Sequence, residues 1–189
     1  MEEQTGQYNW STEMNVLVSA RIPGWHVVYT RSRAEKKVAS ELDAQGIECY
    51  LPVRRQLRQY GNRRKWVDVV LISGYCFVHI SRREYDQVLQ TGNVVSYVTF
   101  NHKAAVVPQR EIDSMKKMLR QTECDVEVSH DTFAPGRKVM IMEGPMLGLT
   151  GELLEEHGKS RFIVRIDAIH TVFITDIPAR NLSLLPVGN

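Results

Sequence analysis

The chain has 189 residues, of which 43% are hydrophobic and 24% charged, and its formal net charge is +2. These proportions are ordinary for a globular protein, and no apolar run approaches the roughly 18 residues that a membrane span requires. Glu2 and Glu3 stand where an export signal would carry positive charge. We therefore expect a cytoplasmic protein with no membrane partner, built as one large domain or two small ones.

Basic residues are concentrated between residues 31 and 65. This stretch holds ten Lys and Arg and four acidic residues, a local charge of +6 that leaves −4 for the rest of the chain. Such an excess is typical of a surface that binds a polyanion, although a solvated hairpin gives the same count without a ligand.

The first 120 residues predict strands and helices in alternation. Residues 1–23 have little pattern and are expected to be a tail. Trp25–Thr30 alternates as a strand, Ser32 and Glu35 form the S-x-x-E pattern that starts a helix, and Gly46 supplies its left-handed end.

A long basic hairpin follows, with its turn at Gly61-Asn62, and leads into a second core strand, "GYCFVHI". Ser81 and Glu84 repeat the helix-start pattern. Two short strands come next, and Pro108 opens a third helix on which Ile112, Met115 and Leu119 share one face. This order predicts an α+β fold whose N-terminal domain, residues 24–120, is a ferredoxin-like (split βαβ) antiparallel sheet with three helices.

The remaining sequence predicts a linker and a small second domain. Residues 121–132 are polar and acidic and are expected to link the domains. From residue 133 to 189, short alternating runs such as "KVMIM" and "RFIVRI" are joined by Gly-rich turns, as in an SH3-like barrel. The turn residues Gly144, Pro145, Gly148 and Gly151 suit a backbone that needs positive φ or close approach.

The stretch "GRKVMIMEGPMLGLTGEL" resembles the KOW motif, and the first domain is similar to the NusG N-terminal domain. The second resemblance is carried by "WHVVYTRSRAEKKVASEL" and by "LISGYCFVHI", which is similar to the family's "LFPGYVFV". Together they cover residues 25 to about 186. The basic hairpin and the "SGY" sequence resemble a specialised paralogue of the RfaH or UpxY type, which regulates capsular polysaccharide operons.

The resemblance implies a transcription elongation or antitermination factor that is not an enzyme. In that family, the first domain binds the clamp helices of bacterial RNA polymerase and increases processivity, while the KOW domain recruits a ribosomal protein or a termination factor. It implies polymerase contacts at Tyr75 and Phe77, with Trp25 and Tyr29 on the neighbouring strand adding to the same surface. It also implies contact of Arg31 and Arg33 with non-template DNA. The alternative is that these two arginines belong to a solvated turn beside the helix start.

Period-two alternation places Tyr75 and Phe77 on one face of their strand and Cys76 and Val78 on the other. If the second set packs under the helices, the two aromatic side chains face outward, where such residues dominate protein interfaces. The alternative is that both are core residues. The hairpin cations could lie along nucleic acid or along the polymerase: Arg54, Arg55, Arg58, Arg63, Arg64 and Lys65.

Other functions find less support in the sequence. Cys49, Cys76 and Cys124 have no disulfide-framework or zinc spacing, so we expect reduced cysteines, no metal and no cofactor. No P-loop or G-x-G-x-x-G sequence is present. The stronger rival is a ribosome-associated RNA-binding protein that uses the KOW module. Six basic and six acidic residues from 133 to 189 make that segment neutral, which suits a protein partner better than RNA.

Overall fold

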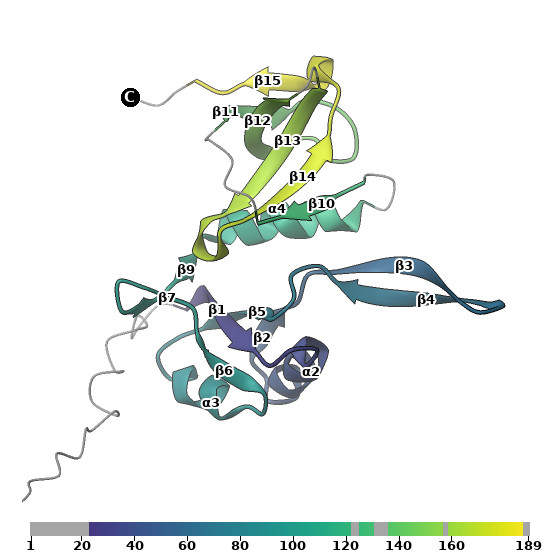
Figure 1. Cartoon of the computed structure of the whole chain (residues 1–189). Coiled ribbons are helices and arrows are strands. Elements are labelled where there is room, and N and C mark those ends of the chain that lie inside the picture. Colours follow the sequence, from purple (N-terminus) through teal and green to yellow (C-terminus); the bar gives the residue numbers. More distant parts are fainter. Residues whose placement is uncertain (1–22, 122–124, 131–135, 157–158, 187–189) are drawn as a thin grey trace, which may run out of the picture.

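The computed structural model describes residues 23–121, 125–130, 136–156 and 159–186. Helices and strands alternate in its first part, and strands predominate in its second (Figure 1). The tail predicted over residues 1–23 lies almost wholly outside the described residues, as does Cys124. The α-helices of the described part are α2 (Glu35–Ala44), α3 (Tyr85–Gln90) and α4 (Gln109–Arg120).

The first sheet contains β1, β2, β5, β6 and β9, in the order β2-β5-β1-β6 with β9 also paired to β1. All of these pairs are antiparallel. A separate long hairpin and a short one extend from this part of the chain. The strands are β1 (Gly24–Thr30), β2 (Glu48–Tyr50), β3 (Val53–Tyr60), β4 (Arg63–Val70), β5 (Tyr75–Ile80), β6 (Val94–Tyr97), β7 (Thr99–Phe100), β8 (Lys103–Ala104) and β9 (Val106–Val107). The predicted antiparallel sheet with three helices is thus confirmed, and the ferredoxin-like assignment remains a prediction.

Helices cover both faces of the first sheet. On one face, Cys76 and Val78 of β5 lie in a core cluster with Val38 of α2 and Val88 of α3. The predicted packing of this strand face under helices is confirmed. On the other face, β1 and β5 contribute to a second cluster together with the apolar side of α4. The central part of β1 and β5 is therefore covered on both faces, since both strands carry apolar side chains on each face.

The apolar side of α4 is close to the predicted one. Ile112 and Met115 are fully buried, as expected from their helical spacing, and Leu119 is partly buried. Met118 adds a third fully buried side chain to this stripe. The stripe continues into the core of the second sheet, since Phe162 and Phe173 belong to the same cluster.

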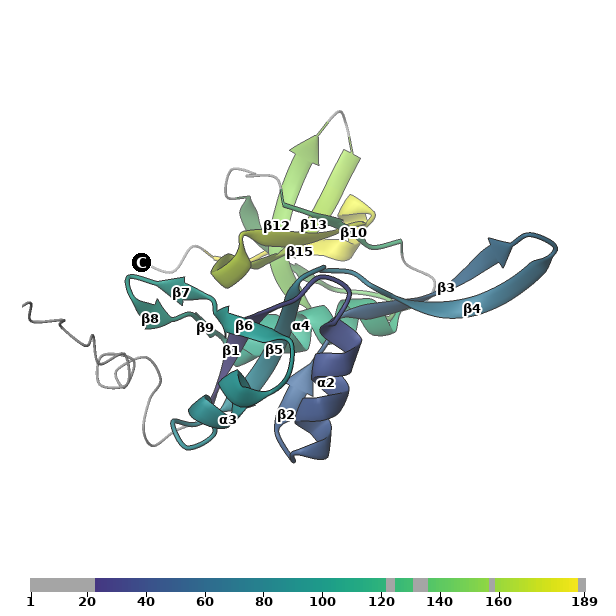
Figure 2. The same cartoon turned by 60° about the horizontal axis from the view of Figure 1, so that its bottom comes forward.

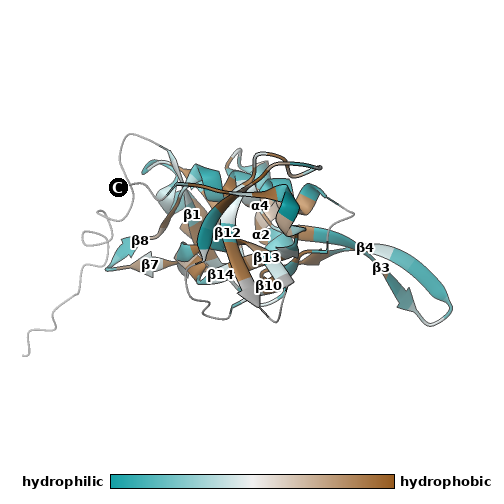
Figure 3. Cartoon of the chain, turned by 90° about the horizontal axis from the view of Figure 1, so that it is seen from above, coloured by the Kyte–Doolittle hydropathy of each residue, from teal (hydrophilic) through white to brown (hydrophobic). Residues whose placement is uncertain are grey.

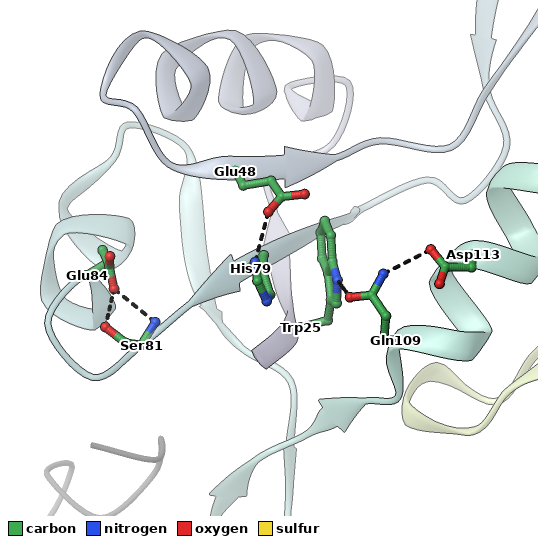
Figure 4. Close-up of polar contacts among 7 residues, drawn as sticks. All are labelled: Trp25, Glu48, His79, Ser81, Glu84, Gln109 and Asp113. Carbon is green, nitrogen blue, oxygen red and sulfur yellow. Dashed lines mark hydrogen bonds and ion pairs between the residues drawn. The ribbon is translucent and has the colours of Figure 1, made fainter. Parts of the chain in front are cut away.

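The two predicted helix starts behave differently. At Ser81, the main-chain N–H donates to the Glu84 carboxylate at 2.9 Å, so the predicted pattern forms (Figure 4). At Ser32 the prediction is wrong, because the Glu35 carboxylate instead accepts the N–H of Gly74 at 2.7 Å. Glu35 is 95% buried there, and a buried carboxylate requires such a donor. Glu35 therefore binds Gly74, which is distant in the sequence, and does not cap the start of its own helix.

The second sheet has six strands in the order β10-β14-β13-β12-β11-β15. Every pairing in it is antiparallel. Its strands and 3-10 helices are β10 (Glu127–Ser129), β11 (Arg137–Ile141), β12 (Thr150–Glu156), β13 (Lys159–Ile166), η2 (Asp167–Ile169), β14 (Thr171–Asp176), η3 (Ala179–Asn181) and β15 (Leu182–Leu184). These strands agree with the β-rich segment that the sequence predicts, and the SH3-like assignment remains a prediction.

Strand β10 lies inside the stretch predicted as a linker, residues 121–132. It pairs with β14 through Val128 opposite Phe173, so this part of the stretch belongs to the second sheet. Its sequence, "EVS", is too short and polar to have indicated a strand. The prediction of a linker is wrong for Glu127–Ser129.

Helix α4 lies between the two sheets, as both views show (Figures 1 and 2). Lys117 of α4 and Gln121, the residue after the helix, bind the Gly-rich turn that follows β11. The Lys117 ammonium donates to the carbonyl of Leu147, and the Gln121 amide donates to that of Pro145 at 3.4 Å. The turn therefore has a structural partner in the first part of the chain.

The glycines of that turn have different roles. Gly144 and Gly148 have φ of +83° and +77°, in the left-handed region. Gly151 is different, because a Cβ built there would lie 2.5 Å from the carbonyl oxygen of Ile163 and 2.5 Å from the ring of Phe162. Both reasons given for the turn glycines, positive φ and close approach, are confirmed at separate positions.

The two described cysteines are neighbours in space. Cys49 on β2 and Cys76 on β5 are free thiols, and Cys76 is fully buried. A hydrogen bond with the Cys76 thiol lowers the pKa of Cys49. In the sequence they are 27 positions apart, and only the pairing of β2 with β5 brings them together.

Among the described residues, no helix is long and apolar enough to cross a membrane.

Because Gly151 has no room for a methyl group, Gly151→Ala is expected to destabilise the protein by about 1–3 kcal/mol, the usual cost of overpacking. Gly148→Ala is expected to cost only about 1 kcal/mol, since it meets no atom within 4 Å and carries only the left-handed backbone cost. Urea denaturation of both variants measures these differences.

Gly24→Ala is the control, because the nearest atom to its Cβ is 3.9 Å away and its φ is not positive. Its midpoint should remain close to that of the wild type. A Gly151→Ala variant as stable as the Gly24→Ala variant would contradict the close approach of β12 to β13.

Candidate interaction surfaces

Three cross-strand pairs of β1 and β5 form a row along one face of the first sheet. From one end to the other, these pairs are Trp25 with His79, Val27 with Phe77 and Tyr29 with Tyr75. Directly opposite residues of an antiparallel pair share a face, so the four predicted polymerase-contact residues do lie in one row. Their exposure differs along it.

The Trp25 end of the row is covered by α4. The indole N–H of Trp25 donates to the Gln109 side chain at 2.7 Å, and that amide in turn donates to Asp113 at 2.9 Å (Figure 4). The Lys116 ammonium lies 4.8 Å from the centre of the indole ring. His79 also stacks on the indole ring, with centroids 5.1 Å apart. Trp25 is thus an anchor between the sheet and the helix.

The expected outward orientation of Phe77 is wrong. Phe77 is 0% exposed and Trp25 is 2% exposed, and both lie in the core cluster that contains Ile112 and Met115. The face of β5 was assigned correctly, but α4 covers it. As the structure stands, neither side chain is available to a partner.

At the other end of the row, the side chains of Tyr29 and Tyr75 are not covered by α4. Tyr29 is 40% exposed and Tyr75 is partly exposed, and their rings lie 5.0 Å apart between centroids. Burial, followed by the hydrogen bond with the Tyr29 hydroxyl, raises the pKa of Tyr75 to about 12. The Tyr75 hydroxyl is therefore neutral at physiological pH. We call Tyr29 and Tyr75 the tyrosine pair.

A cavity of about 490 Å³ adjoins the tyrosine pair. Two exposed apolar side chains lie beside it, Phe100 at 72% and Val106 at 64% exposure. Residues of η2 and the following turn form its other side. The residues that line it are Tyr29, Tyr75, Val98, Thr99, Phe100, Ala105, Val106, Asp167, Ala168, Ile169 and His170. Exposed aromatic and aliphatic groups around a concavity are typical of a site that binds an apolar side chain of a partner.

The turn before Tyr75 is held by the buried carboxylate of Glu35. Gly74 has φ of +84° and donates its N–H to Glu35, while its carbonyl accepts the N–H of Thr30 at 2.8 Å. These bonds fix the start of β5 against the end of β1. The tyrosine pair is therefore positioned by the main-chain turn at Gly74. No sequence pattern predicts the hydrogen bond between this turn and Glu35.

The predicted nucleic-acid residues fall in two places. Arg31 and Arg33 are exposed in the loop between β1 and α2, and Arg33 has φ of +62°. The six hairpin cations lie on β3 and β4, which extend away from the body of the molecule (Figures 1 and 2). The Lys36 ammonium donates to the carbonyl of Asp68, which joins α2 to the base of the hairpin.

Arg54 at the base of the hairpin has protein partners. Its guanidinium lies 3.0 Å from the Asp125 carboxylate and donates to the carbonyl of Val126 at 3.2 Å. Arg55 lies over the ring of Trp66, 5.5 Å from its centroid. The hairpin cations therefore do not form one equivalent set.

Within the described ranges, no group of three or more His, Cys, Asp or Glu side chains is arranged to hold a metal ion.

A partly buried carboxyl group, Glu111, lies where α4 meets the second sheet. Burial, and then the charge of Asp167, raise the pKa of Glu111 to about 7, against the opposing effects of Arg110 and Lys138. One carboxyl oxygen of Glu111 is buried with no hydrogen-bond partner. These residues line a cavity of about 320 Å³ between α4 and the second sheet.

Comparison with known proteins finds a family match for the first part of the chain. Residues 23–116 match the NusG family model, described as transcription termination factor nusG. A solved Thermotoga maritima NusG structure, titled for its domain interaction, is 21% identical, with a TM-score of 0.48, and the match covers 87% of this chain and 98% of that chain.

Two structures of the MjSpt4:Spt5 complex also match. Conformation A is 12% identical with a TM-score of 0.29, covering 85% of this chain and 97% of that chain. Conformation B is 14% identical with a TM-score of 0.27, covering 87% and 99%.

The tyrosine pair and the basic hairpin are the two candidate interaction surfaces of the described chain. The class follows from the family match: residues 23–116 are a NusG-family domain, whose model is described as transcription termination factor nusG. The resemblance found in the first strand, the first helix and the "SGY" strand is confirmed at this level.

The position of Glu111 makes stability depend on pH. Its pKa is about 7 in the folded chain against an ordinary value of 4.5, so the folded state retains a proton that the unfolded state releases between these values. Stability therefore falls as pH rises through this window. We expect Glu111→Gln to match the wild type in melting temperature near pH 4.5 and to exceed it increasingly up to pH 8.

Thermal melts of the wild type and Glu111→Gln across this pH range measure the difference between their melting temperatures. Other groups titrate in both proteins, so their effects cancel in that difference. Asp43→Asn, an exposed carboxyl group on α2, is the control and should show no such divergence. Parallel curves for Glu111→Gln and the wild type would show that Glu111 does not retain its proton at the α4 interface.

Proposed function

We propose that this chain is a transcription elongation or antitermination factor that binds the clamp helices of bacterial RNA polymerase and increases processivity. The observation that supports this most directly is the tyrosine pair, exposed at the edge of a NusG-family domain and beside an apolar cavity. Tyr29 and Tyr75 make the contact. Trp25 and Phe77 support it from the core.

The chemistry of the tyrosine pair suits a helical protein partner. Tyrosine combines a large apolar ring with a hydroxyl group, and such side chains carry much of the energy of protein interfaces. Phe100 and Val106 extend the apolar surface around the pair. An amphipathic helix places one apolar side chain in such a cavity and keeps its polar face in water.

The action is proposed to be specific to certain operons, such as those for capsular polysaccharide, as in paralogues of the RfaH or UpxY type. Arg31, Arg33 and one face of the basic hairpin contact nucleic acid, including the non-template DNA strand. Their support is the exposure of both arginines and the projection of the hairpin from the body. The second sheet, as a KOW module, binds a ribosomal protein or a termination factor.

The rival function is a ribosome-associated RNA-binding protein that uses the same KOW module. It draws no support from the first domain, whose family is one of transcription factors. The two functions differ in the particle that the chain binds, so a single co-purification experiment separates them.

The test is retention of bacterial core RNA polymerase by the immobilised chain. Wild type is expected to retain the polymerase, and the Tyr29→Ala/Tyr75→Ala variant to bind at least about tenfold more weakly, because interface hot spots contribute about 2 kcal/mol or more. Phe77 is left intact, since truncating a fully buried ring would destabilise the domain by about 3–5 kcal/mol.

Trp66→Ala is the control, because it removes an aromatic ring that is exposed, at 55%, but lies on the hairpin. It should retain polymerase like the wild type. Loss of binding by Trp66→Ala alone would move the contact to the hairpin. A wild type that ignores polymerase but sediments with ribosomes would replace the proposed function by its rival.

A further inference from the structure

The β3–β4 hairpin is a strongly basic surface of the described chain. From Val53 to Val70 it holds six Lys and Arg and one acidic residue, Asp68. It extends beyond the sheets and helices in both side views, and its outer part is hydrophilic (Figures 1, 2 and 3). Such an extension contributes little to the core, so its composition reflects what it contacts.

The strand register divides the cations between two faces. Arg58 pairs with Lys65, and Tyr60 pairs with Arg63. Since opposite residues share a face and alternate residues along a strand return to it, these four side chains lie together. We call Arg58, Tyr60, Arg63 and Lys65 the basic face.

The opposite face has a different character. It carries the exposed apolar pair Leu57 and Trp66, which are opposite each other in the register. Arg55 on this face lies over the Trp66 ring, and Asp68 is directly opposite Arg55. Charge on this face is therefore partly compensated within the hairpin.

The basic face has no such compensation. Arg58, Arg63 and Lys65 are exposed, and none of them forms an ion pair with a residue in the described ranges. Like charges directly opposite each other, as Arg58 and Lys65 are, destabilise a two-stranded ribbon. A polyanionic ligand would remove this repulsion.

Tyr60 identifies the kind of polyanion. Its ring is 57% exposed at the end of β3, directly opposite Arg63 and two residues from Arg58. An exposed aromatic ring among unpaired cations is the arrangement by which proteins bind single strands, with phosphates on the cations and a base stacked on the ring. A duplex keeps its bases stacked and offers the ring no partner.

We propose that the basic face of the hairpin binds single-stranded nucleic acid, with Arg58, Arg63 and Lys65 neutralising phosphates and Tyr60 stacking on an unpaired base. This assigns one face and one ligand class to the nucleic-acid contact of the proposed function. It rests on the hairpin alone and is tested without polymerase, so either proposal can fail while the other stands.

The experiment is fluorescence anisotropy of the full chain with a labelled 20-nucleotide oligo-dT, the matching oligo-U and a 20-base-pair duplex. Wild type is expected to bind the single strands more tightly than the duplex. Arg58→Ala/Lys65→Ala should weaken single-strand binding at least tenfold and reduce the slope of log K against log salt by about 1.4, since each phosphate contact on a single strand contributes about 0.7.

Arg55→Ala/Arg64→Ala is the matched control, because it removes the same charge from the opposite face. It should leave affinity within about threefold of the wild type. Tyr60→Ala should weaken binding roughly 5- to 150-fold, the measured range for a base stacked on an aromatic ring, with an unchanged salt slope, and Tyr60→Phe should restore it. Circular dichroism checks that each variant is folded.

Equal losses in the two double variants would overturn the assignment to one face. Duplex binding as tight as single-strand binding, with Tyr60→Ala neutral, would overturn the stacking and leave a phosphate-binding surface. Absence of binding to all three ligands would reject the proposal outright. Preference between oligo-dT and oligo-U distinguishes DNA from RNA as the source of the strand.

Discussion

The packing of α4 against the first sheet is the constraint on which the rest of the structure depends. Strands β1 and β5 are apolar on both faces, and a sheet of this kind must be covered twice. Helices α2 and α3 cover one face, and the stripe of Ile112, Met115 and Met118 covers the other. The hydrogen bond from Trp25 to Gln109 fixes the helix at a single position along the sheet.

The position of α4 explains why only one end of the aromatic row is exposed. The helix begins at Gln109, beside Trp25, and its C-terminal half contacts the turn of the second sheet. The tyrosine pair lies beyond the covered part of the row, next to η2. A partner that covers Tyr29 and Tyr75 therefore also meets η2, so the site belongs to both parts of the chain.

Sequence reasoning succeeded where the cause is local. Alternation assigned the faces of β5, the turn at Gly61 placed the hairpin, and Gly46, with φ of +75°, ends α2. The predictions from sequence were wrong where a residue far away in the chain determines the burial or the hydrogen bonds of a side chain. The exposure of Phe77 depends on α4, which follows it by some thirty residues, and the role of Glu35 depends on Gly74. Strand pairing likewise recruits "EVS" into the second sheet.

The two candidate surfaces differ in how closely they depend on the fold. Tyr75 starts a buried strand and is held through Gly74 by a buried carboxylate, so changes around it also disturb the core. The outer hairpin contributes nothing to the core clusters, and Arg58, Arg63 and Lys65 are exposed. Substitutions at exposed positions change stability little. The hairpin is therefore where a chain of this fold changes its ligand preference at the least cost in stability, while the tyrosine pair remains fixed.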